Sequence, residues 1–386
     1  MSTQTTTAYR RLLATATIGA LAWTFACRPA WSPDSSQIVY PGKVGEKLAL
    51  ARYDLKKKTS EVLFVAPVEK QTSIPVYLDS GELMLMSNKP GETRPLVISR
   101  LAMADGKVAP VGKPLEVRTD NDALDHLVLP PVVVGNTLFL GGKSLTKIDL
   151  TTQKVVRGDL PDTPNDISLA RRGDGICYLT TRDKDKPGDW ELGTLDPETL
   201  IGKVLIRGPK ASKGNPGWKP MPMIAFSRDL SRVAMPAERV DRETTEQTQT
   251  AILVFNDGKL ENVLPLSDID NLIQVSSLAF GADNVSVFTV FARENPQGHA
   301  FHLFETTFSG SVQRETLLLE LPPTKTDLAP AVQMQLALSP DGKWAAVATA
   351  YIQELRDQSQ SLLLVDISGK GREVQRIAFP EPAKKK

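Results

Sequence analysis

The sequence predicts an all-β fold: a single β-propeller, with seven blades of four antiparallel strands as the best count and six or eight blades as alternatives. Two observations predict it. A turn followed by an apolar strand recurs along the chain, most clearly in "WSPDSSQIVY" at 31–40 and "LSPDGKWAAVAT" at 338–349. Around the second copy, the last part of the chain holds four strand-like segments, which is the strand content of one propeller blade.

The turn itself is predicted from its residue types, Ser339-Pro340-Asp341-Gly342. Proline sets φ at the second turn position, aspartate accepts hydrogen bonds from nearby backbone amides, and glycine adopts positive φ without strain. The motif therefore joins two antiparallel strands. In the copy at 32–35, Ser35 stands in place of the glycine, so we expect that turn to be less relaxed.

Strand-like segments follow each turn in order along the chain. In the first unit they are "KLALARYDL" and "SEVLFVAP", in the second "RPLVISRLAM" and "PLEVRT", in the third "SLTKIDLTTQKVV", and in the fourth "WELGTLDPETLIGKVLI". The fifth unit has "TAILVFNDGKLENVLPL", the sixth "FHLFETTFSGSVQRETLLL", and the seventh "SLLLVDI" with "REVQRIAF". Short apolar runs bounded by turns favour strands over helices.

One polar residue marks the turn that opens each unit. These residues are Asp34, Asp79, Asn136, Asp174, Asp229, Asp283 and Asp341. Their mean spacing of about 51 residues is in the range of propeller repeats once loop insertions are allowed. We therefore expect one propeller over 27–380, with blades that start near 28, 64, 121, 161, 211, 271 and 328, and a disordered tail at 381–386.

Composition narrows the possible partners. The 386 residues are 41% hydrophobic, and 46 basic residues against 45 acidic ones leave a formal charge of +1, so no global field favours nucleic acid. With two cysteines the chain has no disulfide framework. These values are typical of a globular protein that does not bind nucleic acid, and we expect a monomer.

The N-terminal segment 9–27, "YRRLLATATIGALAWTFAC", has the layout of an export signal. Its apolar run, 12–26, is shorter than the ~20 residues of a membrane-spanning helix. The segment "TFAC" resembles a bacterial lipobox, in which Cys27 would carry the lipid. Cleavage by an ordinary signal peptidase, retention without cleavage, and a Cys27 that belongs to the first strand are the alternatives. We expect 1–26 to be a signal peptide or anchor, and the protein to be periplasmic or attached to the envelope membrane.

The segments "AWSPDSSQIVY", "AFSRDLSRVAM" and "ALSPDGKWAAVAT" resemble the Ser-Pro-Asp-Gly repeat of TolB-type β-propellers, which also occurs in propellers joined to prolyl oligopeptidase-like enzymes. The resemblance covers most of the chain after Cys27 but is close only in the first, fifth and seventh units. TolB-type proteins carry an α/β domain ahead of the propeller and the peptidases a hydrolase domain. We expect neither here, and therefore a free-standing propeller.

Few residues offer catalytic or metal-binding chemistry. His126, near Asp122 and Asp125, is interpreted as a surface or inter-blade histidine, because the spacing fits no calcium loop. His299 and His302 lie three apart on a predicted strand, so their side chains point to opposite faces and do not converge on one ion.

Cys177 follows a turn in an apolar strand and is interpreted as a buried, inert thiol. The acidic segments 120–125 and 183–189 are interpreted as solvated loops. The basic segment 210–220, with Trp218, fits either a polyanion contact or a polar connection between blades. We assign no catalytic residue, no metal ligand and no cofactor.

Two functions fit these features. The first is a non-enzymatic scaffold of the cell envelope that binds another envelope protein and is attached to the membrane through a lipid on Cys27. The second is a propeller enzyme, similar to a lactonase or lyase, with its site at the central channel. The predicted innermost strands supply chiefly Asp166, Arg171 and Arg172 as ionisable groups, which is poor material for metal binding or acid–base catalysis, so the first is favoured.

Overall fold

A computed structural model describes residues 28–45, 47–66, 73–88, 96–104, 107–117, 131–142, 144–158, 166–181, 190–208, 217–240, 247–266, 272–295, 298–310, 312–324, 335–348, 361–369 and 373–381. Within these ranges the secondary structure consists of strands and turns, and no helix has the length and apolarity needed to cross a bilayer. Cys27, His126 and the acidic segments 120–125 and 183–189 lie outside the described residues.

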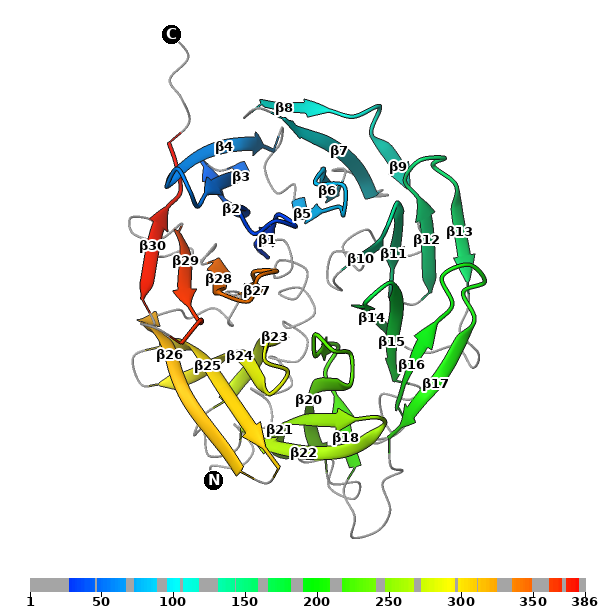
Figure 1. Cartoon of the computed structure of the whole chain (residues 1–386), viewed down its shortest axis with the longest axis vertical. Coiled ribbons are helices and arrows are strands. Elements are labelled where there is room, and N and C mark those ends of the chain that lie inside the picture. Colours follow the sequence, from blue (N-terminus) through cyan, green and yellow to red (C-terminus); the bar gives the residue numbers. More distant parts are fainter. Residues whose placement is uncertain are drawn as a thin grey trace, which may run out of the picture.

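Seven antiparallel sheets stand around a common centre, as Figure 1 shows, and each is built from consecutive strands. The first strand of a blade lies nearest the centre and the last lies at the rim. The predicted all-β propeller of seven blades is thus confirmed.

The strands of the first four blades, in chain order, have the following bounds. Blade one has β1 (Ala30–Trp31), β2 (Gln37–Val44), β3 (Lys47–Asp54) and β4 (Thr59–Val65). Blade two has β5 (Ser73–Tyr77), β6 (Leu83–Asn88), β7 (Leu96–Ala104), β8 (Lys107–Pro110) and β9 (Leu115–Val117). Blade three has β10 (Val132–Val134), β11 (Thr137–Leu140), β12 (Leu145–Asp149) and β13 (Val155–Gly158). Blade four has β14 (Asp166–Arg172), β15 (Gly175–Thr181), β16 (Trp190–Leu195) and β17 (Gly202–Arg207).

The remaining strands complete the ring. Blade five has β18 (Gly217–Pro220), β19 (Ala225–Phe226), β20 (Arg232–Val240), β21 (Gln247–Asn256) and β22 (Lys259–Pro265). Blade six has β23 (Leu272–Phe280), β24 (Ser286–Asn295), β25 (Gly298–Ser309) and β26 (Val312–Thr324). Blade seven has β27 (Gln335–Leu338), β28 (Trp344–Ala348), β29 (Ser361–Asp366) and β30 (Val374–Ala378).

Two blades divide one strand position between two short strands. In blade two, β8 and β9 pair with opposite halves of β7, and the break between them contains Gly112 with positive φ and Pro114. In blade five, β18 and β19 both pair with β20, and Pro222 lies in the break. Because proline has no amide hydrogen for a ladder, it interrupts a strand at these points.

The hydrophobic core lies between the blades. Side chains alternate along each strand, so one blade fills two interfaces. On β24, Phe288 and Val290 belong to the cluster shared with blade seven, whereas Val287 and Phe291 belong to the cluster shared with blade five. The blades are therefore held to their neighbours mainly by apolar packing.

The ring closes between blade seven and blade one by side-chain contacts, because among the described strands none of either blade comes from the other end of the chain. Trp31 Nε1 donates to Ala337 O (3.0 Å), and the Tyr40 hydroxyl donates to Ala378 O (3.1 Å). Tyr40 also meets the ring of Phe379 edge to face. We call this interface the closing seam.

Each blade has two kinds of connection at opposite ends of its strands. The turns from first to second strand and from third to fourth strand leave one face of the ring. The connections from second to third strand, and from one blade to the next, leave the other face. Antiparallel order alone fixes this division.

Candidate functional site

The turns between the first and second strands form a group on one face, which we call the turn collar: residues 32–36, 78–82, 135–136, 173–174, 227–231, 281–285 and 339–343. All seven polar residues singled out from the sequence lie in it, one in each blade. They come from segments far apart in the sequence, and the ring brings them to one face.

Three blades share the same hydrogen-bonded turn. In blade one, Ser32 Oγ donates to Asp34 Oδ1 (2.7 Å) and accepts from the amide of Gln37 (2.9 Å). The Asp34 oxygen also accepts from the amide of Ser36 (3.1 Å). The serine and aspartate thus satisfy the backbone amides that the turn leaves free.

Blades five and seven repeat this arrangement. Ser227 Oγ donates to Asp229 Oδ1 (2.6 Å) and accepts from the Arg232 amide (2.8 Å). Ser339 Oγ donates to Asp341 Oδ1 (2.6 Å) and accepts from the amide of Trp344 (3.0 Å). The serine and the aspartate make the hydrogen bonds in all three turns, so the working motif is Ser-x-Asp.

Positive φ recurs at one position of these turns, as the sequence predicts for Gly342. In the three turns the residue after the aspartate is Ser35 (φ 59°), Leu230 (φ 63°) and Gly342 (φ 72°). Only glycine adopts this conformation without cost, so Ser35 and Leu230 carry strain that Gly342 does not.

The turn hydrogen bonds hold these aspartates in the charged form. Hydrogen bonds from Ser32 lower the pKa of Asp34, and those from Ser227 and Ser231 lower the pKa of Asp229. At Asp341 partial burial raises the pKa, but hydrogen bonds from Ser339 and Lys343 outweigh it and leave the pKa lowered. A carboxylate used in this way is a turn cap and a poor general acid.

The other four positions make different contacts. Asp283 accepts from the amide of Ser286 (2.9 Å) and from its hydroxyl (2.6 Å). Asn136 Nδ2 donates to Thr151 Oγ1 (3.1 Å) in the turn between β12 and β13 of the same blade. Asp174, in the turn after β14, attracts Arg171 electrostatically.

Asp79 takes part in a contact between blades that are not neighbours. It accepts two hydrogen bonds from Arg171 of blade four, at 2.8 and 3.0 Å. Arg171 lowers the pKa of Asp79 through these bonds. Blade three lies between these two blades in the ring, and its turn 135–136 has two residues, fewer than the turns of most other blades.

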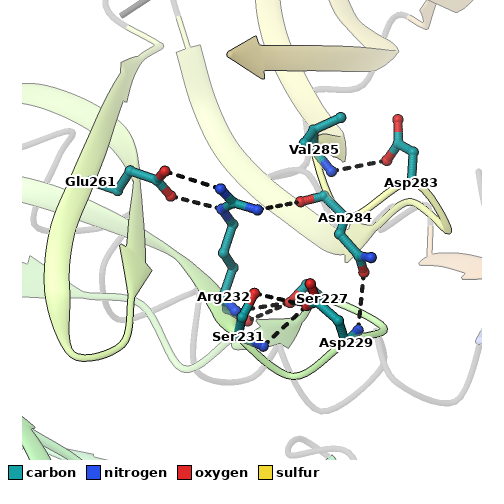
Figure 2. A network of polar contacts seen from close by, with 8 residues as sticks. All are labelled: Ser227, Asp229, Ser231, Arg232, Glu261, Asp283, Asn284 and Val285. Carbon is teal, nitrogen blue, oxygen red and sulfur yellow. Dashed lines mark hydrogen bonds and ion pairs between the residues drawn. The ribbon is translucent and has the colours of Figure 1, made fainter. Parts of the chain in front are cut away.

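A second network joins blades five and six, as Figure 2 shows. Arg232 makes a bidentate ion pair with Glu261 (2.7 and 3.1 Å) and donates to Asn284 O (3.3 Å). Asn284 Oδ1 in turn accepts from the amide of Asp229 (3.1 Å). One arginine therefore fixes the turn of blade five to the turn of blade six.

Contacts of the same kind continue around the collar. Arg172 donates to Leu230 O (2.9 Å), joining blades four and five, and the amide of Asp341 donates to Ser35 Oγ (3.0 Å), joining blades seven and one. Gly342 approaches Ala282 so closely that a β-carbon there would overlap with it. The polar groups of the collar are engaged mainly in holding blades together.

The sequence did not identify Arg232, Glu261 and Asn284 as partners. The signal was weak but present: Arg232 begins a strand directly after a Ser-x-Asp turn. Arg171 and Arg172 were named as channel groups, whereas both join blades through the collar. The side chain of Asp166, at the start of β14, is outside the described part.

The remaining candidates are structural where they are described. Cys177 is fully buried, and burial raises the pKa of its thiol to about 11. His302 is buried on β25, stacked on Phe291. Trp218 lies on β18 with Arg239 over its ring, so this part of 210–220 is a strand. Among the described residues, no group of three or more His, Cys, Asp or Glu is placed to hold a metal ion.

Comparison with family models and with curated protein sequences finds no match. Solved structures match over nearly the whole chain at low identity. A Bacteroides uniformis protein proposed to be a 6-phosphogluconolactonase is 12% identical, with TM-score 0.53 and 89% of this chain and 96% of that chain covered. The β-propeller domain of the Trilobed protease from Pyrococcus furiosus is 10% identical, with TM-score 0.51 and coverage of 93% and 97%.

TolB from Acinetobacter baumannii is also a structural neighbour. It is 15% identical, with TM-score 0.39, and 77% of this chain and 55% of that chain are covered. Similarities at these identities establish the propeller fold and nothing finer, because unrelated functions share this fold.

Proposed function

We propose that this chain is a non-enzymatic β-propeller of the cell envelope that binds another protein. The observation that carries the proposal is the use of the collar. Its aspartates cap turns, and its arginines join blades. A face whose charged groups are committed to internal contacts makes a rigid ring and offers few groups for catalysis.

The opposite face is the proposed binding surface. There the sequence between second and third strands is long in several blades, at 89–95, 182–189, 241–246 and 349–360, whereas collar turns have five residues or fewer. Insertions that are carried on a rigid scaffold are where binding residues concentrate. In this proposal the blades supply the scaffold and these segments supply the specificity.

The N-terminal sequence supports a further part of the proposal, attachment to the membrane through a lipid. A lipid on Cys27 would lie one residue before Arg28, where the described chain begins. β1 runs from there toward the collar, so a lipid would be attached at the start of an innermost strand. A Cys27→Ser variant is expected to lose lipid labelling and to leave the membrane fraction. Unchanged labelling and fractionation would remove the anchor from the proposal.

Site-specific photo-crosslinking in intact cells tests the binding face. A crosslinking residue at Lys47, beside the connection from β2 to β3, is expected to give one reproducible adduct with an envelope protein. The same residue at Arg228, in the collar, is expected to give none. Adducts only from the collar would reverse the assigned face, and no adduct from either position would refute the scaffold function.

The enzyme alternative is tested on the purified full chain. Turnover of lactones that is lost on substituting Arg171 would favour an active site at the channel mouth. The scaffold function predicts no turnover.

A further inference from the structure

Exposed apolar side chains gather on one part of the rim. Across the described ranges nine large hydrophobic residues are exposed, and six of them lie on β13, β17 and β22, the outermost strands of three consecutive blades, or directly before β17. These six are Val155, Val156, Ile201, Leu205, Leu260 and Val263. Single exposed hydrophobic residues are ordinary on a protein surface, whereas a contiguous group of them marks a site of interaction.

The three strands follow one another along the rim, as Figure 1 shows. Gly158, at the end of β13, lies against Leu200, the residue before Ile201, and a β-carbon on it would be 2.8 Å from Leu200 Cδ1. Gly258, in the turn before β22, lies beside β17, and a β-carbon on it would be 3.7 Å from Leu205 O. The end of each outermost strand therefore meets the start of the next. We call the connected surface the rim band: residues 154–158, 201–207 and 259–263.

The exposed charges of the rim band are nearly all basic. They are carried by Lys154, Arg157, Lys203, Arg207 and Lys259. Glu261 is the one carboxylate within the band, and it pairs with Arg232. Elsewhere on the rim, β4, β9 and β26 each carry at least one exposed glutamate. The band is thus distinguished from these strands by both its apolar side chains and its charge.

Most carboxylates at the borders of the band are engaged within the molecule. Asp196 accepts from the amide of Thr199 (2.8 Å), and Glu198 pairs with Lys147 of blade three (3.0 Å). Asp257, in the turn before β22, adds one exposed negative charge. The surface that a partner would meet is therefore apolar with an excess of positive charge.

The exposed residues of β17 and its first flank alternate in kind. Ile201, Lys203, Leu205 and Arg207 are exposed, and they are apolar and basic in turn. An extended chain has side chains on one side at every second residue, so its spacing matches this series. The geometry suits an extended segment better than a helix, whose neighbouring side chains on one face are three or four residues apart.

Side chains, rather than added backbone pairing, would carry the contact. β17 and β22 are the last strands of their sheets, but the register of each shifts at a bulge, opposite Leu192 and Gly193 in one blade and Val254 and Phe255 in the other. A bulge interrupts the row of backbone groups that a continuous added strand needs.

The chemistry of the band also distinguishes between possible occupants. A two-fold pairing of the band with the same band of a second copy would bring like charges together, which opposes such a dimer. A membrane-binding surface typically carries aromatic side chains at the lipid interface, and none of the exposed large hydrophobic residues in the described ranges is aromatic. An acidic protein segment has neither disadvantage.

We propose that the rim band binds an extended segment of another protein in which apolar residues alternate with aspartate or glutamate. The apolar side chains of the segment pack on the exposed valine, isoleucine and leucine side chains, and its carboxylates pair with the lysines and arginines between them. The rim band is separate from the opposite face proposed above as a binding surface, so it adds a second contact to that function.

Fluorescence anisotropy with the purified full chain tests the band. The probe is a fluorescein-labelled peptide of alternating glutamate and valine, long enough to span β17, and the control is the same peptide with lysine in place of glutamate. We expect saturable binding of the acidic probe that weakens as sodium chloride is raised, because salt screens exposed charges. Absence of saturable binding, or equal binding of the two peptides, would overturn the proposal.

Charge variants locate the bound peptide. The double variant Lys203→Glu, Lys259→Glu should weaken the apparent Kd by about tenfold or more, because two attractions become repulsions. Arg314→Glu changes an exposed arginine of β26, outside the band, and should leave the Kd unchanged. Equal effects of the double variant and Arg314→Glu would show that the peptide responds to net charge alone, and would refute the site.

A matched pair of leucines tests the apolar part. Leu260→Ser, in the band, should weaken the apparent Kd by about threefold to tenfold, because the contact loses apolar area. Leu317→Ser, on β26, should not, although the two residues are nearly equally exposed at 48% and 44%. Both variants should unfold at the wild-type temperature. A Kd that is unchanged in Leu260→Ser would remove the apolar contact and overturn the proposal.

Two further measurements separate the occupants. Flotation of the wild type with phosphatidylglycerol vesicles that is lost in Lys203→Glu, Lys259→Glu would assign the band to a membrane. A dimer in sedimentation equilibrium that Leu260→Ser abolishes would assign it to a second copy. Either result would overturn the proposal. The crosslinking test at Lys47 concerns the opposite face, so failure of that test and failure of peptide binding at the rim are distinguishable.

Discussion

Gly342 shows how one residue of the repeat turn serves two purposes. Its φ of +72° is one that glycine adopts without strain, and a β-carbon there would also overlap with Ala282 of blade six. The sequence predicts the first purpose from the Ser-Pro-Asp-Gly turn. The second depends on a contact between blades and is visible only in the ring.

We expect Gly342→Ala to destabilise the protein by roughly 2–4 kcal/mol, the sum of left-handed backbone strain and overpacking. Chemical denaturation measures the loss. The matched control is Gly369→Ala, which has φ of +89° but open space around the β-carbon, so it should cost only the backbone share, about 1–2 kcal/mol. Equal losses in the two variants would show that the contact with Ala282 is unimportant.

At the scale of the element, a collar turn reverses the chain and also positions side chains that join neighbouring blades. In blade five, Arg232 begins β20 directly after the turn and reaches both Glu261 on β22 and Asn284 in blade six. Both partners of the ion pair are about three-quarters shielded from solvent, with 21% and 25% of the side chains exposed. Such a pair is screened less than a surface pair.

Arg232→Lys is expected to lower stability by about 1–2 kcal/mol, because lysine cannot keep the bidentate pair and the bond to Asn284 together. Arg207→Lys is the control, since Arg207 pairs with Glu191 from a side chain that is 69% exposed and should cost little. The free energy of unfolding of the two variants and the wild type, measured in urea at low and high salt, tests this difference. A larger loss for Arg207→Lys would contradict the assigned role of the collar pair.

His302, on β25, is expected to make the stability of the protein depend on pH. Burial lowers its pKa, Arg293 lowers it further, and Glu320 opposes them in part. The folded protein therefore binds a proton on this histidine less readily than the unfolded chain does. The contribution of His302 to stability is complete above the unfolded pKa of about 6.5 and is lost as the pH falls below it.

His302→Leu should flatten the fall in stability between pH 7 and pH 5, because leucine binds no proton. Unfolding midpoints at a series of pH values for the two proteins provide the test. If both lose stability with the same slope over this window, His302 is not the group responsible.

For the whole molecule, the closing seam is the interface with no covalent connection between its blades. Every other neighbouring pair is joined by the chain, so separation there is limited by the linker. At the seam no linker helps to hold the two blades together, and side-chain contacts do so instead, among them those of Trp31, Tyr40 and Phe379 and the bond between Ser35 and Asp341. Local opening should therefore occur at the seam first.

Gly42→Ala tests this expectation, because a β-carbon at Gly42 would overlap with the ring of Phe379. Hydrogen exchange is expected to quicken in β1, β2, β29 and β30 and to stay unchanged in blades three and four. Gly141→Ala introduces a comparable overlap with the backbone of Ile167 between blades three and four, which the chain connects. Faster exchange spread evenly over the ring in Gly42→Ala would contradict a seam that opens first.

The sequence by itself determined the fold and its repeat. Strand alternation and turn residues are local signals, so Asp34, Asp229 and Asp341 were placed in turns from their neighbours alone. The same local signals missed β18, because Trp218 lies in a segment rich in Gly, Pro and Lys that is typical of a connection, and its strand is stabilised by pairing with β20.

Only the tertiary structure decided which side chains meet. Asp79 and Arg171 are 92 residues apart, and Ser35 and Asp341 are 306 apart, yet each pair is bonded across blades. Closing a ring places residues by blade geometry rather than by sequence distance, and no local pattern records that geometry.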